Sequence, residues 1–347
     1  MLTEMKTIIN RLVIAGCAAL FLTSCTAGDP SSAPTDTYHP AVQAGVTQYP
    51  ITINTCGKSI TITERPARAV ALEQTQTEFL LTLGLESAMV GTSYLTDPIL
   101  PTLEHSYDSV PVLAAKYPSH EVVLEVAPDF IYAAGSWAVA DDAAGSRETW
   151  EKLEIPVYLS SLACDQTGVS DPTSNFDGIF TELRTLGEIF DVQDRAETVI
   201  ADQQQRIDDE MATLPHNLSD KSLAWWYTGT RTPYFGGNSS AAGDFATRFG
   251  MENSFGNSTG RWNEANWEAL ADQDPDVLVL SDLSRGSEGD SAQAKIDFLE
   301  NNPLTSQMSA VKNHRFVVVP GSGRDRSIRT ITSFEAVSAG LREFFAQ

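Results

Sequence analysis

Three arginines lie close together near the C-terminal end of an otherwise acidic chain. The stretch from Gly321 to Arg329 contains Arg324, Arg326 and Arg329, and it follows an apolar run that is expected to form a strand. Guanidinium groups form paired hydrogen bonds with oxyanions such as carboxylate, catecholate and hydroxamate. We therefore expect this cluster to contact an anionic ligand. A solvated loop in which Asp325 pairs with one arginine is the alternative.

Aromatic side chains and two further arginines occupy similar positions in other loops. Arg231 and Arg285 each follow an expected strand. Flat rings beside arginines suit a large, partly aromatic anion or chelate. The aromatic candidates for ligand contact are Tyr94, Trp137, Tyr227 and Tyr234.

The sequence contains no evident set of direct metal ligands and no catalytic motif. No pair of its five histidines has the spacing of metal ligands on one helix, although His120 or Tyr234 could serve as an axial ligand of haem. There is no nucleophile elbow, P-loop or dinucleotide fingerprint. Gly321-Ser322-Gly323 has no obvious histidine partner. We therefore expect no catalytic residues, and a secreted hydrolase is the weaker, different-class alternative.

The first 25 residues are typical of an export signal. Lys6 and Arg11 precede the apolar run Leu12–Leu22, which is shorter than a membrane-spanning helix requires. Leu22-Thr23-Ser24-Cys25 resembles the bacterial lipobox, so residues 1–24 are expected to be removed and Cys25 to carry a lipid. Cys17 fits the same pattern but would leave almost no apolar segment before it. An ordinary secretory signal is the alternative, and both place the mature protein outside the cytoplasm.

The composition predicts a folded, acidic protein that avoids nucleic acid. The 347 residues include 23 Lys plus Arg against 46 Asp plus Glu, a formal net charge of -23, and 42% are hydrophobic. Such a chain can bury a core and repels polyanions. Residues 25–50, rich in Thr, Ser, Ala and Pro, are expected to form a flexible tether to the membrane. No later segment is apolar enough to span a membrane.

Strand and helix patterns alternate through the rest of the chain. This alternation predicts an α/β fold in which parallel sheets are covered on both faces. We expect two Rossmann-like lobes, residues 51–175 and 214–347, joined by residues 176–213 as one long helix or two, with a ligand cleft between the lobes.

The two halves share a local pattern. Glu121 is followed seven residues later by Pro128-Asp129 and a strand, and Glu268 is followed in the same way by Pro275-Asp276. The occurrence of this pattern once per half supports two similar lobes.

Several segments together resemble the substrate-binding proteins of ferric-siderophore and cobalamin ABC importers, the class III periplasmic binding proteins. They are Glu64–Leu72, Gln76–Leu85, Met89–Gly91, the "PD" elements at Ala127–Ile131 and Asp274–Leu278, Phe235–Gly237 and Val319–Gly321. The resemblance covers residues 51–345. It implies two rigid lobes, a connecting helix, a shallow cleft and delivery of the ligand to a permease dimer.

The resemblance also gives Glu121 and Glu268 a role. In related proteins an acidic residue at the start of the helix before "PD" in each lobe docks on arginines of the permease. Two distant charged contacts would fix the orientation of the complex. The alternative is that both glutamates only favour the helix dipole.

Cys56 and Cys164 fall in the expected first lobe, where an extracytoplasmic location permits a disulfide. The bond would close a loop of about 100 residues, worth about 4.7 kcal/mol in the chain-entropy model. Two free thiols are the alternative.

Taken together, these features predict a monomeric, lipid-anchored binding protein that captures a ferric siderophore and presents it to an ABC permease. Iron would arrive inside the ligand, with no intrinsic cofactor. Haem, cobalamin or another anionic cofactor is the alternative ligand. The connecting helix is expected to limit the lobes to modest movement on ligand binding.

Overall fold

The computed structural model describes residues 47–167, 175–258, 260–286, 289–324 and 326–346. The predicted signal peptide, Cys25 and nearly all of the predicted tether lie outside these ranges. The last predicted tether residues, 47–50, are described, and Thr47 is hydrogen-bonded to Asp191 and Glu188.

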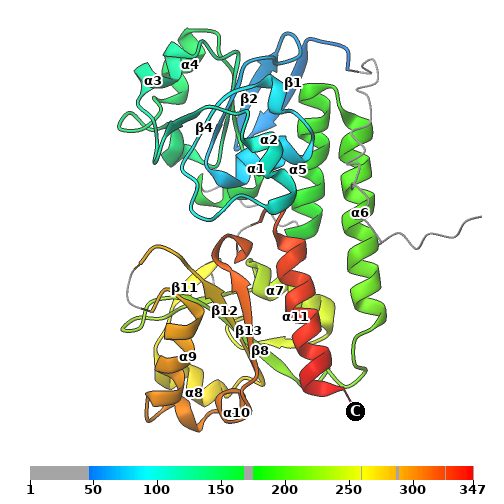
Figure 1. The fold of residues 1–347 in the computed structure, drawn as a ribbon, viewed down its shortest axis with the longest axis vertical. Coiled ribbons are helices and arrows are strands. Elements are labelled where there is room, and N and C mark those ends of the chain that lie inside the picture. Colours follow the sequence, from blue (N-terminus) through cyan, green and yellow to red (C-terminus); the bar gives the residue numbers. More distant parts are fainter. Residues whose placement is uncertain (1–46, 168–174, 259, 287–288, 325, 347) are drawn as a thin grey trace, which may run out of the picture. The chain divides into compact units, whose positions relative to one another are not determined.

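The first lobe is built on a five-stranded parallel sheet (Figure 1). The strand order is β5-β4-β3-β6-β7, and every residue of β3, β6 and β7 is buried because helices cover both faces of the sheet. The strands are β3 (Ala69–Leu72), β4 (Met89–Ser93), β5 (Val112–Ala114), β6 (Phe130–Ala133) and β7 (Val157–Leu159). The helices are α1 (Gln74–Thr82), α2 (Glu104–Tyr107), α3 (His120–Glu125) and α4 (Arg147–Lys152).

A separate antiparallel hairpin precedes this sheet. Strands β1 (Ile51–Thr55) and β2 (Lys58–Ile62) pair along their whole length and are joined by Cys56 and Gly57, both with positive φ. The sequence from Ile51 to Thr63 alternates β-branched and polar residues around Gly57-Lys58, which is typical of a hairpin. The inward-facing isoleucines pack against the main core.

Two helices connect the sheets. They are α5 (Asn175–Phe190) and α6 (Gln193–Ala212), and they pack against each other. The chain turns at Asp191, whose φ is 58°, and at Val192. The sequence left open whether one helix or two would form, and the structure has two.

The second lobe has a mixed sheet of order β11-β9-β8-β12-β13, with β10 also paired to β8. Its strands are β8 (Ser222–Thr228), β9 (Tyr234–Gly236), β10 (Glu252–Asn253), β11 (Trp262–Glu264), β12 (Val277–Asp282) and β13 (Phe316–Pro320). Its helices are α7 (Ala241–Phe249), α8 (Trp267–Gln273), α9 (Ala292–Asn301), α10 (Ser309–Lys312) and α11 (Thr330–Phe345). The pattern from Glu264 to Asp272 is typical of a helix, but α8 begins only at Trp267 because residues 262–264 pair with β9 as a strand.

Short 3-10 helices fill several connections. They lie at Glu86–Ala88, Pro101–Leu103, Ser136–Val139, Ser161–Thr167, Thr305–Gln307 and Gly321–Arg324.

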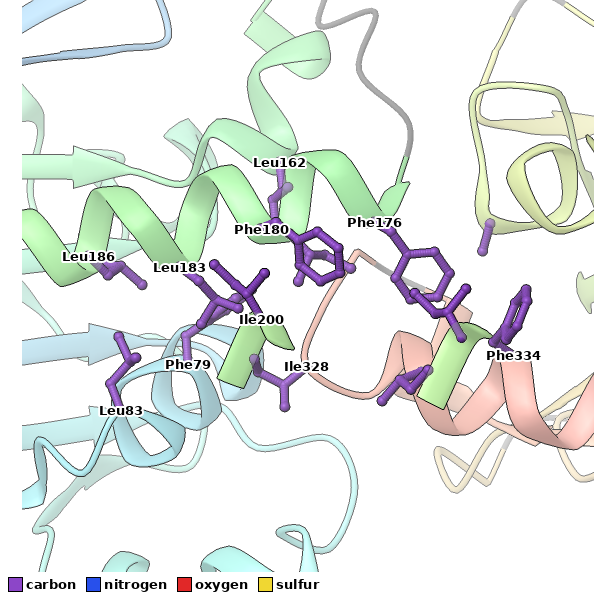
Figure 2. Packing of buried hydrophobic residues seen from close by; sticks show 14 of the residues in the cluster. Phe79, Leu83, Leu162, Phe176, Phe180, Leu183, Leu186, Ile200, Ile328 and Phe334 are labelled. Carbon is purple, nitrogen blue, oxygen red and sulfur yellow. The ribbon is translucent and has the colours of Figure 1, made fainter. Parts of the chain in front are cut away.

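One hydrophobic cluster continues from the first lobe into the second (Figure 2). Phe176 and Phe180 of α5 belong to it, together with Ile328 and Phe334 from the C-terminal segment. The rings of Phe176 and Phe334 meet edge to face with centroids 5.5 Å apart. The lobes therefore share apolar packing as well as covalent connections. The predicted α/β architecture with two sheet-containing lobes is confirmed.

Candidate ligand-binding site

A cavity of about 300 Å³ lies between residues of both lobes. Most of its wall comes from the segments that follow β3, β4, β6 and β7, so it sits at the carboxyl ends of the parallel strands, where open α/β sheets bind ligands. The first lobe contributes Glu73, Gln74, Thr75, Gln76, Tyr94, Thr96, Tyr117, Ala134, Trp137, Ser160, Leu162 and Ala163, and the second contributes Arg261, Ser322 and Arg326.

Aromatic rings and one carboxylate form a wall of the cavity in the first lobe. The rings of Tyr94 and Tyr117 meet edge to face at 4.8 Å. Glu73 accepts hydrogen bonds from the Tyr117 hydroxyl and, at 2.8 Å, from Trp137 Nε1. Glu73 has a φ of 91°, which is rare for a residue with a side chain and is found mainly at functional positions.

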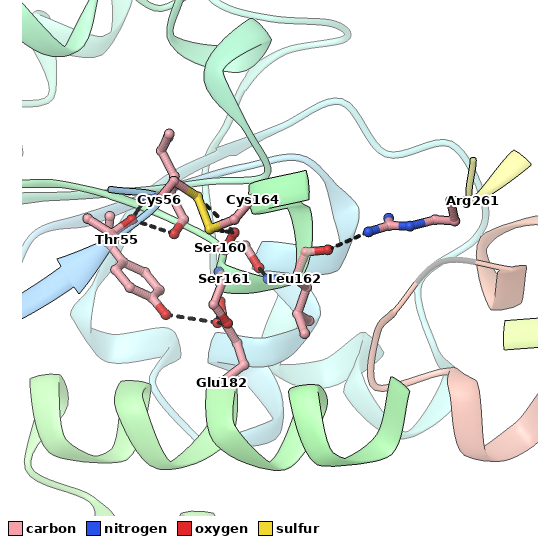
Figure 3. The surroundings of a disulfide bond; sticks show 10 residues. Thr55, Cys56, Ser160, Ser161, Leu162, Cys164, Glu182 and Arg261 are labelled. Carbon is pink, nitrogen blue, oxygen red and sulfur yellow. Dashed lines mark hydrogen bonds between the residues drawn. A yellow bond between two sulfur atoms is a disulfide. The ribbon is translucent and has the colours of Figure 1, made fainter. Parts of the chain in front are cut away.

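The second lobe supplies the positive charge. Arg326 donates from Nε to Asn175 Oδ1 at 2.9 Å and from Nη2 to the Ser239 carbonyl at 3.3 Å. Arg261 donates from Nη2 to the Leu162 carbonyl at 2.9 Å (Figure 3). Both guanidinium groups are therefore held in fixed positions at the cavity and bridge to residues of other segments.

The segment from Ser160 to Cys164 is anchored from beneath by the fully buried carboxylate of Glu182 (Figure 3). This carboxylate accepts hydrogen bonds from the hydroxyls of Tyr132 at 2.5 Å, Tyr158 at 2.8 Å and Ser161 at 2.6 Å. Burial, and then the Glu182 charge, raise the pKa of both tyrosines well above the usual value, so they stay protonated as donors.

The same segment is joined to the β1–β2 hairpin by a sulfur–sulfur pairing of Cys56 and Cys164 (Figure 3). Their Cα atoms are 4.9 Å apart, within the range of disulfides. Thr55 reinforces the junction, since its hydroxyl donates to the Leu159 carbonyl at 2.7 Å and accepts from the Leu159 amide at 2.9 Å. Formation of the bond in the exported protein stays a prediction.

A family model described as a periplasmic binding protein matches residues 70–322. This range includes every residue that lines the cavity except Arg326. This chain belongs to the periplasmic binding protein family. The predicted family resemblance is thus confirmed. Members of the family bind solutes, and the family implies an extracytoplasmic location.

Individual relatives of this periplasmic binding protein are distant. The Fe(3+)-citrate-binding protein YfmC of Bacillus subtilis (strain 168) is 22% identical over 253 residues, 73% of each chain. Three solved structures share the fold. A periplasmic binding protein from Veillonella parvula DSM 2008 has a TM-score of 0.73 at 24% identity and covers 84% of this chain and 96% of its own.

The second is an ABC-type Fe3+-hydroxamate transport system structure from Saccharomonospora viridis DSM 43017, with a TM-score of 0.67 at 24% identity, covering 86% of this chain and 100% of that one. The third is the periplasmic haem-binding protein HutB of Vibrio cholerae, with a TM-score of 0.61 at 19% identity, covering 78% and 97%.

Across the described ranges of this periplasmic binding protein, no helix combines the length and apolar character needed to cross a membrane. Within the same ranges, no three His, Cys, Asp or Glu side chains are grouped so as to hold a metal ion.

Three of the sequence-predicted ligand residues meet at the cavity: Tyr94, Trp137 and Arg326. The side chain of Arg324 lies outside the described part of the chain. Arg231 is exposed and does not line the cavity.

The remaining predicted ligand residues make other contacts. Arg329 is buried and pairs with Glu78. Arg285 pairs with Asp290 at 2.6 Å and donates to the Tyr227 hydroxyl at 3.1 Å. The Tyr234 hydroxyl donates to Glu264. His120, an alternative haem ligand, packs against Trp150 with ring centroids 4.3 Å apart. None of these side chains lines the cavity.

Sequence reasoning missed most of the polar lining. Glu73, Gln74, Thr75 and Gln76 directly follow the buried run of β3, and this position was the available signal, since residues after a parallel strand face the ligand edge. Tyr117 lies among the loop aromatics of the first half that the sequence points out, whereas Arg261 follows no recognisable apolar run and is revealed only by the fold.

The two glutamates of the repeated pattern occupy equivalent positions. Glu121 and Glu268 are exposed in the first turns of α3 and α8, which are capped by Ser119 and Asn266. A hydrogen bond from its own backbone N–H, and then one from Ser119, lower the pKa of Glu121, so its carboxylate is charged at neutral pH.

Proposed function

We propose that this periplasmic binding protein captures a ferric chelate outside the cytoplasm and delivers it to an ABC permease. The observation that carries the proposal is the cavity itself, which is lined by Arg261 and Arg326 of one lobe and by Tyr94 and Trp137 of the other. Guanidinium groups bind the anionic oxygens of a chelate, and aromatic rings pack against its flat surfaces. Iron is then part of the substrate.

The ligands for which similar proteins are named support a ferric ligand. The Bacillus subtilis relative is named for ferric citrate, and the Saccharomonospora viridis structure for Fe3+-hydroxamate transport. The proposal includes a monomer anchored through a lipid on Cys25, a disulfide between Cys56 and Cys164, and docking of the permease on Glu121 and Glu268. The equivalent exposure of the two glutamates supports the docking role.

Haem is the second candidate ligand because two tyrosines reach the cavity. A tyrosine phenolate is a known axial ligand of haem iron, and Tyr94 and Tyr117 both line the wall. One of the similar structures is also a haem-binding protein.

The test is titration of the purified protein with ferric citrate, a ferric hydroxamate, a ferric catecholate, haem and cobalamin, followed by tryptophan fluorescence. Trp137 lines the cavity, so a bound chelate should quench its emission. Arg326→Gln should weaken binding by about tenfold or more, the cost of one charge-assisted hydrogen bond. Arg231→Gln is the matched control because Arg231 is exposed and does not line the cavity.

Saturable quenching by a ferric chelate, weakened in Arg326→Gln and unchanged in Arg231→Gln, would support the proposal. Binding of haem alone, with a Soret shift lost in Tyr94→Phe or Tyr117→Phe, would replace the ferric chelate by haem. Binding of none of the five compounds would overturn the proposed function.

A further inference from the structure

The N-terminus of α1 opens directly into the cavity. The first three residues of this nine-residue helix, Gln74, Thr75 and Gln76, all line the wall. The first backbone N–H groups of a helix have no partners within it, and the aligned peptide dipoles add partial positive charge at that end. Such an end favours an anionic oxygen when nothing else occupies it.

The side chain of the N-cap residue of α1 does not cap the helix. Glu73 stands at the N-cap position, but its side chain makes no capping hydrogen bond. It accepts from Tyr117 and Trp137 instead. The first turn also contains no acidic residue. The Glu73 carboxylate is therefore engaged with the aromatic wall and provides no cap for the first backbone N–H groups of α1.

A second, independent observation comes from Gln76. Its side chain is only 2% exposed and lines the cavity, and its Oε1 has no hydrogen-bond partner among the described residues. A buried amide left without a partner is costly. By contrast, the Gln74 amide is occupied, accepting from the backbone N–H groups of Thr96 at 2.9 Å and Asp97 at 2.8 Å.

The Gln76 amide can satisfy a ligand oxygen. A half-turn of the amide group exchanges the positions of the Oε1 acceptor and the Nε2 donor, so that Nε2 can donate to a ligand oxygen. The charged residues of the lining are two guanidinium groups, Arg261 and Arg326, and one carboxylate, Glu73.

We infer that the N-terminus of α1 and the Gln76 amide form the subsite for one free anionic oxygen group of the ligand. This inference rests on the proposed function and narrows it. The ligand is a ferric chelate that keeps an uncoordinated carboxylate or a net negative charge, as ferric citrate does, and a neutral chelate lacks the group that the subsite holds.

The test compares Gln76→Glu with wild type, using ferric citrate, iron-free citrate and a neutral ferric tris-hydroxamate as probes. Gln76→Glu keeps the side-chain shape but places a like charge beside the ligand oxygen. Gln307→Glu is the matched control, since Gln307 is exposed and does not line the cavity, and it changes the net charge equally. Gln76→Met, which removes the amide without adding charge, is the second variant. Thermal unfolding of each variant shows whether it is folded.

We expect Gln76→Glu to bind ferric citrate about tenfold to a hundredfold more weakly than wild type, with a smaller loss in Gln76→Met and none in Gln307→Glu. Equal affinity of folded Gln76→Glu and wild type for ferric citrate would overturn the subsite. So would wild-type binding of the neutral tris-hydroxamate without binding of either citrate form, although the proposed function would survive.

Iron-free citrate separates the two proposals. If wild type binds iron-free citrate but no ferric chelate, the proposed function fails. The subsite then holds if Gln76→Glu weakens citrate binding, and fails if it does not. If wild type binds none of the three probes, the subsite is overturned. The proposed function is then decided by the titration with all five ligands described above.

Discussion

Glu78 of α1 and Arg329, the residue before α11, form a buried bidentate ion pair that joins the two lobes. Arg329 Nε donates to Glu78 Oε2 at 2.7 Å, and Nη2 donates to Glu78 Oε1 and, at 2.6 Å, to the Pro98 carbonyl. Glu78 is 1% exposed and Arg329 is 6% exposed. Each charge depends on the other, because removal of one partner leaves an uncompensated charge in the interior.

Breaking this pair should destabilise the whole protein. We expect Glu78→Gln to lower the free energy of unfolding by about 3–5 kcal/mol, as measured by urea denaturation. The double variant Glu78→Leu/Arg329→Met should lose less than either single variant, because no charge is left buried.

The exposed pair Arg184–Glu197 provides the control for this experiment. Arg184→Gln should change stability by less than about 1 kcal/mol. A loss in Glu78→Gln no larger than that in Arg184→Gln would contradict the role assigned to the interlobe pair.

A disulfide between Cys56 and Cys164, once formed in the exported protein, should make stability sensitive to reducing agents. The two residues are separated by 108 positions. The double variant Cys56→Ser/Cys164→Ser should be less stable than wild type by up to about 4.7 kcal/mol. A thiol reductant should lower the melting temperature of wild type and leave that of the double variant unchanged. Equal melting temperatures for reduced and unreduced wild type would contradict the bond.

The buried Lys295 side chain should make the folded protein more stable at alkaline pH than at neutral pH. The side chain is fully buried, donates to the carbonyls of Ser281 at 2.8 Å and Asp290 at 2.5 Å, and lies over the Trp226 ring. Burial lowers its pKa from 10.5 to about 8. Between about pH 8 and pH 10.5 Lys295 is therefore deprotonated in the folded protein but still protonated in the unfolded chain. Because the unfolded chain binds more protons in this range, the free energy of unfolding rises with pH.

The corresponding measurement is the unfolding free energy of wild type and of Lys295→Met from pH 7 to pH 10. The wild type should gain about 2 kcal/mol relative to the variant over this range. Parallel pH profiles for the two proteins would show that Lys295 titrates in the folded state as it does in the unfolded chain.

If the permease docks on Glu121 and Glu268, removal of both charges should reduce transport and leave ligand binding unchanged. The variant Glu121→Gln/Glu268→Gln should reduce ligand-stimulated ATPase activity of the permease by about tenfold at limiting binding protein. Because the contacts are charged and exposed, added salt should weaken wild-type stimulation as well.

Neighbouring acidic residues on the same helices supply the control. Glu125 and Asp272 are exposed on α3 and α8. Glu125→Gln/Asp272→Asn removes the same charge and should stimulate the permease as wild type does. Equal loss in both double variants would indicate a general charge effect in place of two docking points.

Ligand binding should move the lobes only modestly. The continuous hydrophobic cluster and the Glu78–Arg329 pair both resist opening. Spin labels on Ser87→Cys and Gln273→Cys, both exposed and one in each lobe, should change their separation by less than about 10 Å on ligand addition. A larger change would contradict the rigid connection.

Much of the fold could be predicted because its central strands are short apolar runs bounded by polar residues. The sequence alone predicts buried strands at the apolar runs Ala69–Leu72, Phe130–Ala133 and Val157–Leu159, and β3, β6 and β7 match these runs at both ends. Strands β5, β9, β10 and β11 were not predicted, because each has only two or three residues and none is a fully buried apolar run such as β7.

The candidate site was less predictable for a related reason. Arg326 and Arg329 look alike in the sequence, yet one lines the cavity and the other is buried against Glu78. The choice depends on a partner 251 positions away, which local pattern cannot reveal. The polar segment Glu73–Gln76, which includes the first turn of α1, was overlooked. It lines the cavity because it follows the end of strand β3, and its residue types alone do not indicate this.

The hydrophobic cluster shared by the lobes has a consequence for export (Figure 2). Phe334 and Leu341 of α11 pack in the same cluster as Phe176 of α5 and Phe79 of α1. A chain that crosses a membrane from its N-terminal end cannot complete this core until α11 has emerged. For a chain exported in that order, release of residues 330–345 is the event that completes the core shared by the lobes.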